Sequence, residues 1–283
     1  MISKLRTLLV LGRASNLPTV WSNCLAGWLL GGGGEWPRFA VLCAGATLLY
    51  TGGMFLNDAF DAEFDAQHRR ERPVPSGAIA LGLVWKLGLA MLVTGTVLVG
   101  WLGFTTALLA VLLAGSILLY DWLHKLVAFS PALMAVCRFL LYLAASSAAM
   151  RGVTDLAVWS AVTLAAYIMG LSYLARKEAT GLTIRKWPQL LLLIPPTIAL
   201  LLHDGSSRES ALLVSVIFAL WTIRSLRHVW MVPRLVPRAV SGLLAGIVWV
   251  DWLAVADESK VFGVIFIGLF LAALLFQRFV PAT

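Results

Sequence analysis

The chain has 283 residues, of which 60% are hydrophobic and 13% charged, and its formal net charge is +8 at pH 7. A soluble domain carries about a quarter charged residues, so the composition excludes a soluble enzyme and predicts one polytopic membrane domain over residues 1–283. The basic residues lie between apolar runs and not in one long patch, which excludes nucleic acid as a partner and favours loops at the surface of the cytoplasmic membrane.

Ten apolar runs of spanning or near-spanning length follow one another along the chain, and each predicts a transmembrane helix. They cover residues 15–33, 38–58, 81–101, 103–122, 128–150, 155–175, 188–203, 210–231, 236–256 and 261–280. The run at 188–203 is short, which leaves nine spans if one pair of runs forms a broken or re-entrant helix. The expected fold class is therefore an all-α bundle of nine or ten transmembrane helices, packed against membrane lipids.

The charges between the runs predict the orientation of the bundle. If the N-terminus is cytoplasmic, every second connection lies on the cytoplasmic side, and these connections hold most of the basic residues. They contain Arg69, Arg70, Arg72, Lys125, Arg176, Lys177, Arg185, Lys186, Arg224, Arg227, Arg234 and Arg238. The opposite connections hold Arg38, Arg151, Arg208 and Lys260, usually with an acid nearby. This bias predicts that the polar loop after the second run is cytoplasmic.

That loop begins with a cluster of acids at the end of the second run, where Asn57 and Asp58 are followed by Asp61, Glu63 and Asp65. Asn57, Asp61 and Asp65 are spaced i, i+4 and i+8, which places them on one narrow face of a helix. Acids so close to lipid repel one another and are expensive to bury, so a cation is expected between them. Oxygen ligands favour Mg²⁺, which commonly binds one or two carboxylates together with substrate phosphates.

The continuation of the loop carries a family resemblance. The pattern N-D-x-x-D-x-x-x-D, a basic cluster and then Arg72-Pro73-Val74-Pro75-Ser76-Gly77 resemble the first signature of the UbiA superfamily of intramembrane prenyltransferases. The segment 13–27 resembles the opening helix of that family, and Tyr120-Asp121 with Lys125 resembles its basic loop after the fourth span. The resemblance covers nearly the whole chain. Details at Tyr120-Asp121, Cys137-Arg138 and 175–179 look most like the EboC-like branch.

The resemblance implies a helical bundle around a central cavity and a Mg²⁺-dependent transfer of an isoprenyl group from an allylic diphosphate. The acceptor is expected to be lipophilic, aromatic or polycyclic. Asp61 and Asp65, assisted by Asn57 or Asp58, would hold the Mg²⁺ that neutralises the leaving diphosphate. Arg69, Arg72, Lys125 and Lys177 would bind phosphate oxygens. The remaining expected substrate contacts are Asn16, Tyr120, Arg138 and Tyr173.

The second signature of the family is incomplete in this chain. Its matching stretch is 176–182, where Glu178 can stand for the first acid, as a metal ligand and catalytic group, but Leu182 replaces the second. We therefore expect one Mg²⁺ ion instead of two. A UbiA-like protein that handles a lipid or precursor without turnover is the competing hypothesis. A CDP-alcohol phosphotransferase is disfavoured because the string D-x-x-D-G-x-x-A-R is absent.

Several of these residues also have plain structural explanations. Arg69 and Arg72 could simply fix the topology by their positive charge, and so could Lys125. Glu178 could form an ion pair with its basic neighbours. Arg138 lies inside an apolar run, where a charge is costly, so it either faces a cavity or extends its head to the membrane surface. The sequence does not determine the oligomeric state.

Overall fold

The computed structural model describes residues 4–180, 187–231 and 235–282, without the side chains of 177–180 and 206. All regular secondary structure in this part of the chain is helical, and it contains no strand. Its elements are α1 (Lys4–Leu11), η1 (Ala14–Asn16), α2 (Leu17–Leu30), α3 (Trp36–Phe60), α4 (Ala62–His68), α5 (Leu81–Gly100), α6 (Phe104–Leu123), α7 (Ser130–Ser147), α8 (Asp155–Thr180), α9 (Trp187–Leu191), α10 (Ile194–Leu202), α11 (Gly205–Trp230), α12 (Val236–Ala254) and α13 (Lys260–Phe276).

The helices reproduce the apolar runs of the sequence. In the described structure seven of them, α3, α5, α6, α7, α8, α11 and α12, are long and apolar enough to cross a membrane. The first and last runs form shorter helices, α2 and α13. The short run at 188–203 forms a broken helix, because α9 ends at Leu191 and α10 restarts with Pro195 in its first turn. Proline lacks the N–H that would continue the helix and fits its first turn.

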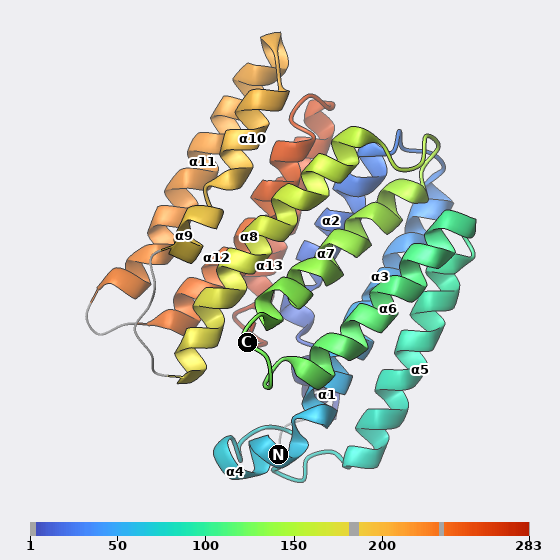
Figure 1. Cartoon of the computed structure of the whole chain (residues 1–283), viewed down its shortest axis with the longest axis vertical. Helices are drawn as coiled ribbons and strands as arrows, with labels where there is room; N and C mark the ends of the chain where they lie inside the picture. Colours follow the sequence, from blue (N-terminus) through green and yellow to red (C-terminus); the bar gives the residue numbers. More distant parts are fainter. Residues whose placement is uncertain (1–3, 181–186, 232–234, 283) are drawn as a thin grey trace.

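The helices pack side by side as one bundle, with α5 and α6 along one side and α10 and α11 along the other (Figure 1). Helix α2 lies in the interior and contacts α3, α7, α8, α12 and α13. Its residues are buried almost all round, as a helix without a polar face requires. Tryptophans at helix ends, among them Trp36, Trp101 and Trp159, are exposed, as in the aromatic belts of membrane proteins. The chain is therefore an integral, multi-pass membrane protein.

Helices α3 and α5 approach each other along a seam of glycines. Gly45 and Gly52 of α3 face Gly95 and Gly88 of α5, and a Cβ atom added at Gly52 would lie 2.8 Å from the backbone nitrogen of Leu92. Real side-chain atoms cannot occupy that space, so the backbones touch where small residues allow it. The seam fixes the position of α3, whose last turn carries Asn57 and Asp58.

The acidic loop lies at one end of the bundle. Helix α4 and the loop before α5 extend beyond the last turns of α3 and α6, and the end of α8 lies toward the same end of the bundle (Figure 1). The described helix ends beside the connections that the charge pattern groups together therefore lie at one end of the bundle. Which side of the membrane this end faces stays a prediction.

Candidate active site

Four polar residues from the last turn of α3 to α4 are buried although they lie at the edge of the bundle. Asn57, Asp58, Asp61 and Asp65 are all at most 7% exposed, whereas Glu63 is exposed. Although α3 ends at Phe60, helical backbone bonds continue from the N–H of Asp61 to the carbonyl of Asn57 (3.0 Å) and from the N–H of Asp65 to the carbonyl of Asp61 (2.9 Å). This nearly continuous helical path turns the acids inward.

Arg72 joins two of the acids. Its Nη1 atom donates to Asp65 Oδ2 at 2.9 Å and to Asp58 Oδ1 at 3.3 Å. The sequence spacing groups Asp65 with Asn57 and Asp61, but the structure brings Asp58 to Asp65 through this arginine. The physical reason is that residues seven apart also return to the same face of a helix. Arg72 itself is placed by the turn that follows it, where Ser76 N–H donates to the Arg72 carbonyl at 3.0 Å.

Asp61 faces a second basic group at the end of α6. Lys125 Nζ lies 2.7 Å from Asp61 Oδ1, and His124 Nε2 lies 3.4 Å from the same oxygen. Burial raises the pKa of Asp61, but hydrogen bonds from His124 and Lys125 outweigh it and hold the pKa below its ordinary value. The ammonium of Lys125 also lies 3.8 Å from the centre of the Phe64 ring, a cation–π contact.

Asn57 connects the acids to two residues that the sequence did not mark as site residues. Its Nδ2 atom donates to Asp121 Oδ1 at 3.1 Å, and its Oδ1 accepts from Arg13 Nη2 at 3.1 Å. Arg13 also lies 3.6 Å from Asp58 and has a left-handed backbone, with φ 43°. Burial lowers the pKa of Arg13, but attraction by Asp58 raises it above its ordinary value, so the guanidinium stays charged. Both residues are ionisable and lie at the ends of apolar runs, and this position is the sequence signal that could have identified them as site residues.

The cluster has more buried acid than its bases neutralise. Four carboxylates, those of Asp58, Asp61, Asp65 and Asp121, face three permanent cations. Among the described residues, Asp65 Oδ1 and Asp121 Oδ2 are buried and find no hydrogen-bond partner. This all-oxygen donor set fits a hard divalent cation in kind, and Arg72 already places one cationic group between two of the carboxylates. In the present arrangement, however, no three His, Cys, Asp or Glu side chains of the described structure stand close enough to enclose a metal ion.

A second polar cluster lies inside the bundle between α2, α7 and α12. Arg138 donates to Asn23 Oδ1 at 2.5 Å and to the hydroxyl and carbonyl of Thr19 at 3.2 Å. Asn23 in turn donates to Asp251 Oδ2 at 2.7 Å, which also accepts from Ser22. Arg138 is only 8% exposed. Its head therefore lies in the interior, hydrogen-bonded to Thr19 and Asn23, and does not extend to the membrane surface.

Of the other predicted substrate contacts, Tyr120 packs beside the acid cluster, whereas Asn16 and Tyr173 have other partners. Asn16 is buried and donates to Tyr50 Oη at 3.2 Å and to the carbonyl of Ala282 at 2.9 Å. Tyr120 stacks on His124 with the ring centres 5.2 Å apart. Tyr173 packs edge-on against Trp187.

The remaining predicted site residues are Arg69, Lys177 and Glu178. Arg69 is half-buried at the end of α4, where its backbone N–H caps the helix. The side chains of Lys177 and Glu178 lie outside the described part of the structure, as does Leu182.

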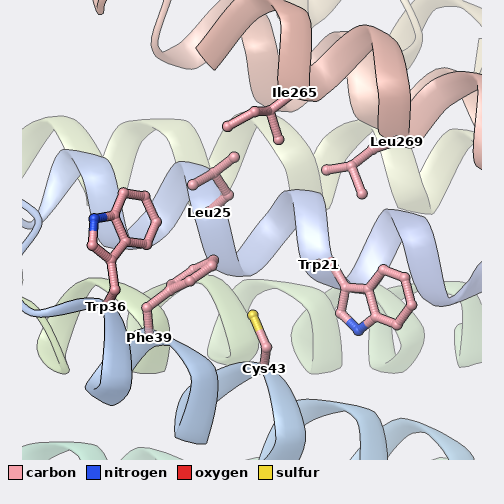
Figure 2. Close-up of a pocket in the computed structure, with 7 residues that line it drawn as sticks. All are labelled: Trp21, Leu25, Trp36, Phe39, Cys43, Ile265 and Leu269. Atoms are coloured by element: carbon pink, nitrogen blue, oxygen red, sulfur yellow. The ribbon is translucent and has the colours of Figure 1, made fainter. Parts of the chain in front are cut away.

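An apolar pocket of about 290 Å³ opens between α2, α3 and α13 (Figure 2). Trp21, Leu25, Trp36, Phe39, Cys43, Ile265 and Leu269 line it. Cys43 precedes Asn57 by fourteen residues on α3, a separation of roughly 21 Å along a helix. The pocket therefore lies in a different part of the bundle from the acids.

Comparisons with known proteins agree on one family. The model of the UbiA prenyltransferase family matches residues 16–259. A digeranylgeranylglyceryl phosphate synthase of Ignicoccus hospitalis is 39% identical over 95 residues, which are 34% of this chain and 31% of that protein. The chain thus spans about a third of the length of this curated relative. The solved structures described next are similar to this chain in fold, at 14–16% sequence identity.

Two solved structures share the fold over most of their length. A UbiA homolog from Aeropyrum pernix is 16% identical, with 91% of this chain and 99% of that chain covered and a TM-score of 0.66. A UbiA homolog from Archaeoglobus fulgidus bound to GPP and Mg²⁺ is 14% identical, with 96% and 97% covered and a TM-score of 0.56. The all-helical bundle expected from the apolar runs is thereby confirmed.

Proposed function

Because this chain belongs to the UbiA prenyltransferase family, we propose that it transfers an isoprenyl group from an allylic diphosphate to a lipophilic acceptor within the membrane. The observation that carries the proposal is the buried cluster of acids and bases where α3, α4 and α6 meet. A membrane protein rarely buries four carboxylates and three permanent cations together unless they bind a charged ligand. An allylic diphosphate has such a charged head and an apolar chain that suits the bundle.

The side chains of the cluster have separate tasks in this reaction. When the allylic C–O bond breaks, negative charge develops on the diphosphate, and Arg72, Lys125 and Arg13 can donate charge-assisted hydrogen bonds to its oxygens. In the present structure Arg72 and Lys125 contact carboxylates, so a bound diphosphate would compete with Asp61 and Asp65 for them. The apolar helices around the site exclude water, which protects the cationic prenyl group from hydrolysis.

Mg²⁺ is the cofactor that the donor set fits. Asp58, Asp61 and Asp65, with Asn57, would hold it, and Glu178 is a further candidate by sequence. When bound, Mg²⁺ supplies positive charge that stabilises the leaving diphosphate. A related structure contains GPP and Mg²⁺, which supports this assignment. Leu182 at the position of the second acid favours a single ion.

The acceptor is the least constrained part of the proposal. The sequence resemblance favours an aromatic or polycyclic acceptor and the EboC-like branch. The curated relatives carry the name digeranylgeranylglyceryl phosphate synthase, which favours a glyceryl phosphate lipid instead. Both acceptor classes belong in the assay.

A second function also has specific support. Each of Asp58, Asp61 and Asp65 is already neutralised by a basic side chain, and Leu182 replaces a carboxylate of the second signature. These features favour a UbiA-like protein that binds a lipid or precursor without turnover.

The deciding experiment is diphosphate release by the purified full-length protein. It is incubated with Mg²⁺ and allylic diphosphates of increasing chain length, first alone, then with an aromatic acceptor, and then with a glyceryl phosphate lipid. Release that depends on one acceptor supports transfer and identifies the acceptor class. Asp61→Asn should abolish release, and Glu63→Gln should not, because Glu63 is exposed. Diphosphate binding without release under all conditions would instead support the non-catalytic function.

We further propose that the acidic end of the bundle faces the cytoplasm, from the distribution of basic residues. In a cysteine-free background, a cysteine at exposed position 68 should react with a membrane-impermeant thiol reagent only after the cytoplasmic side is opened. Val153, which lies in the connection between α7 and α8 at the other end, is the matched site. Its cysteine variant should react from outside, and the reverse pattern would contradict the proposed orientation.

A further inference from the structure

Asp121 is a buried acid for which neither the sequence signatures nor the comparisons provide a role. It lies in the last turn of α6, four residues before Lys125, and it is 3% exposed. Its Oδ1 atom accepts from Asn57 Nδ2 at 3.1 Å. The carboxylate is therefore held against the first residue of the acidic motif by a helix from another part of the chain.

A purely structural role explains one oxygen of this carboxylate but not the other. The bond to Asn57 ties α6 to α3, but an asparagine or a threonine at position 121 could accept the same bond without a charge. The other oxygen, Oδ2, is buried and has no hydrogen-bond partner among the described residues. A buried carboxylate oxygen without a partner is costly, and that cost falls when a cation binds there.

The neighbours of Asp121 leave its carboxylate without a direct ion pair. The amide of Asn57 separates Asp121 from Arg13, because the amide donates to the acid and accepts from the arginine. Within the described residues no basic side chain forms an ion pair with Asp121, unlike Asp58, Asp61 and Asp65. Asp65 Oδ1, the other unpartnered carboxylate oxygen of the cluster, belongs to the same acidic motif.

We propose that Asp121 is an oxygen ligand of the divalent cation held beside the first acidic motif. The proposal rests on the function proposed above, which places a cation beside the first signature. It assigns the ligand to α6, outside both acidic motifs. A carboxylate contributed by a separate helix also restricts how far α6 and α3 can separate when the cation is bound.

The test measures binding of Mn²⁺ alone to the full-length protein in detergent, by the loss of the free-ion signal in electron paramagnetic resonance. Asp121→Asn keeps an oxygen that can accept the Asn57 bond but removes the charge. We expect at least about tenfold weaker Mn²⁺ binding, the size of effect typical for residues that tune a metal site. Glu63→Gln is the matched control, because it removes an exposed acid of the same loop, and its affinity should be unchanged.

A second variant separates direct ligation from a general effect of charge or from damage to the fold. Asp121→Cys replaces a hard oxygen with a soft sulfur, so the ratio of Cd²⁺ affinity to Mn²⁺ affinity should rise at least about tenfold over the unaltered protein. Mn²⁺ binding within twofold of the unaltered protein in Asp121→Asn, or an unchanged Cd²⁺ to Mn²⁺ ratio in Asp121→Cys, would overturn the proposal. Neither measurement needs turnover, so failure of prenyl transfer is recognised separately in the diphosphate assay.

Discussion

Replacing Arg138 with methionine should destabilise the bundle from its interior. Methionine retains much of the side-chain length but loses the cation. The hydrogen bonds to Thr19 and Asn23 disappear together, and Asp251 stays buried without a balancing charge. Leaving buried hydrogen-bond acceptors without their charged donor costs about 1–3 kcal/mol of unfolding free energy. We expect a value near the lower limit, because Ser22 and Asn23 still donate to Asp251.

The coupling between the two charges provides the stricter test. Asp251→Asn leaves Arg138 unbalanced and should also destabilise. The double variant removes both charges, so its cost should fall below the sum of the single costs by about 0.5–3 kcal/mol. The reason is the amide of Asn23, which contacts both groups and transmits their attraction.

The assay is reversible unfolding of the four proteins of this cycle in mixed micelles, followed by circular dichroism and tryptophan fluorescence. Arg151→Met, at an exposed position between α7 and α8, controls for the loss of a positive charge and should leave stability unchanged. If the losses of unfolding free energy in the two single variants add up to that of the double variant, the reasoning is refuted, because Arg138 and Asp251 then do not interact.

The other predictions concern the glycine seam, the acid cluster and the second signature. Gly52→Ala should destabilise by about 1–3 kcal/mol because its Cβ would meet backbone atoms of α5, whereas Gly115→Ala, with open space around it, should be tolerated in the same unfolding assay. Lys125→Met should lower stability at neutral pH. Because the folded-state pKa of Asp61 is depressed, this ion-pair contribution is complete above the ordinary pKa and disappears as the pH falls below about 4. A pH-independent difference between the two proteins would contradict this account. Leu182→Asp should raise the number of bound Mn²⁺ ions from one to two, and two ions in the unaltered protein would show the premise to be wrong.

Much of the fold could be predicted from sequence because lipid imposes a simple rule on it. Each apolar run became a helix or, where Pro195 interrupts the seventh, a broken pair. The exposure of Glu63 and the burial of Asp61 and Asp65 also follow from helical spacing along one segment. These are local properties, which the order of residues determines directly.

Contacts between segments could not be predicted in the same way. The partners of Asn57 come from α6 and from the segment before α2, and Arg72 reaches Asp58 because its loop folds back. Such pairings depend on how far one helix is shifted along another, which periodicity does not specify. Arg138 illustrates the limit: its apolar surroundings indicated a cavity or the membrane surface, but only the packing of α2 and α12 against α7 identifies Asn23 and Asp251 as its network.

The glycine seam has a consequence for the loop that carries Arg72. Because the seam holds α3 against α5, both ends of the segment between them, residues 61–80, are held at a fixed separation. The packing of the two helices already brings the ends of this loop together, so the loop adds little further entropic cost of closure. Arg72 is consequently held beside its carboxylates at a high effective concentration. A shift of α5 by one helical turn, about 5.4 Å, would move one end of the loop and lower the effective concentration of Arg72 near its carboxylates. Backbone contact near the middle of two helices thus sets the strength of a charge interaction at their end.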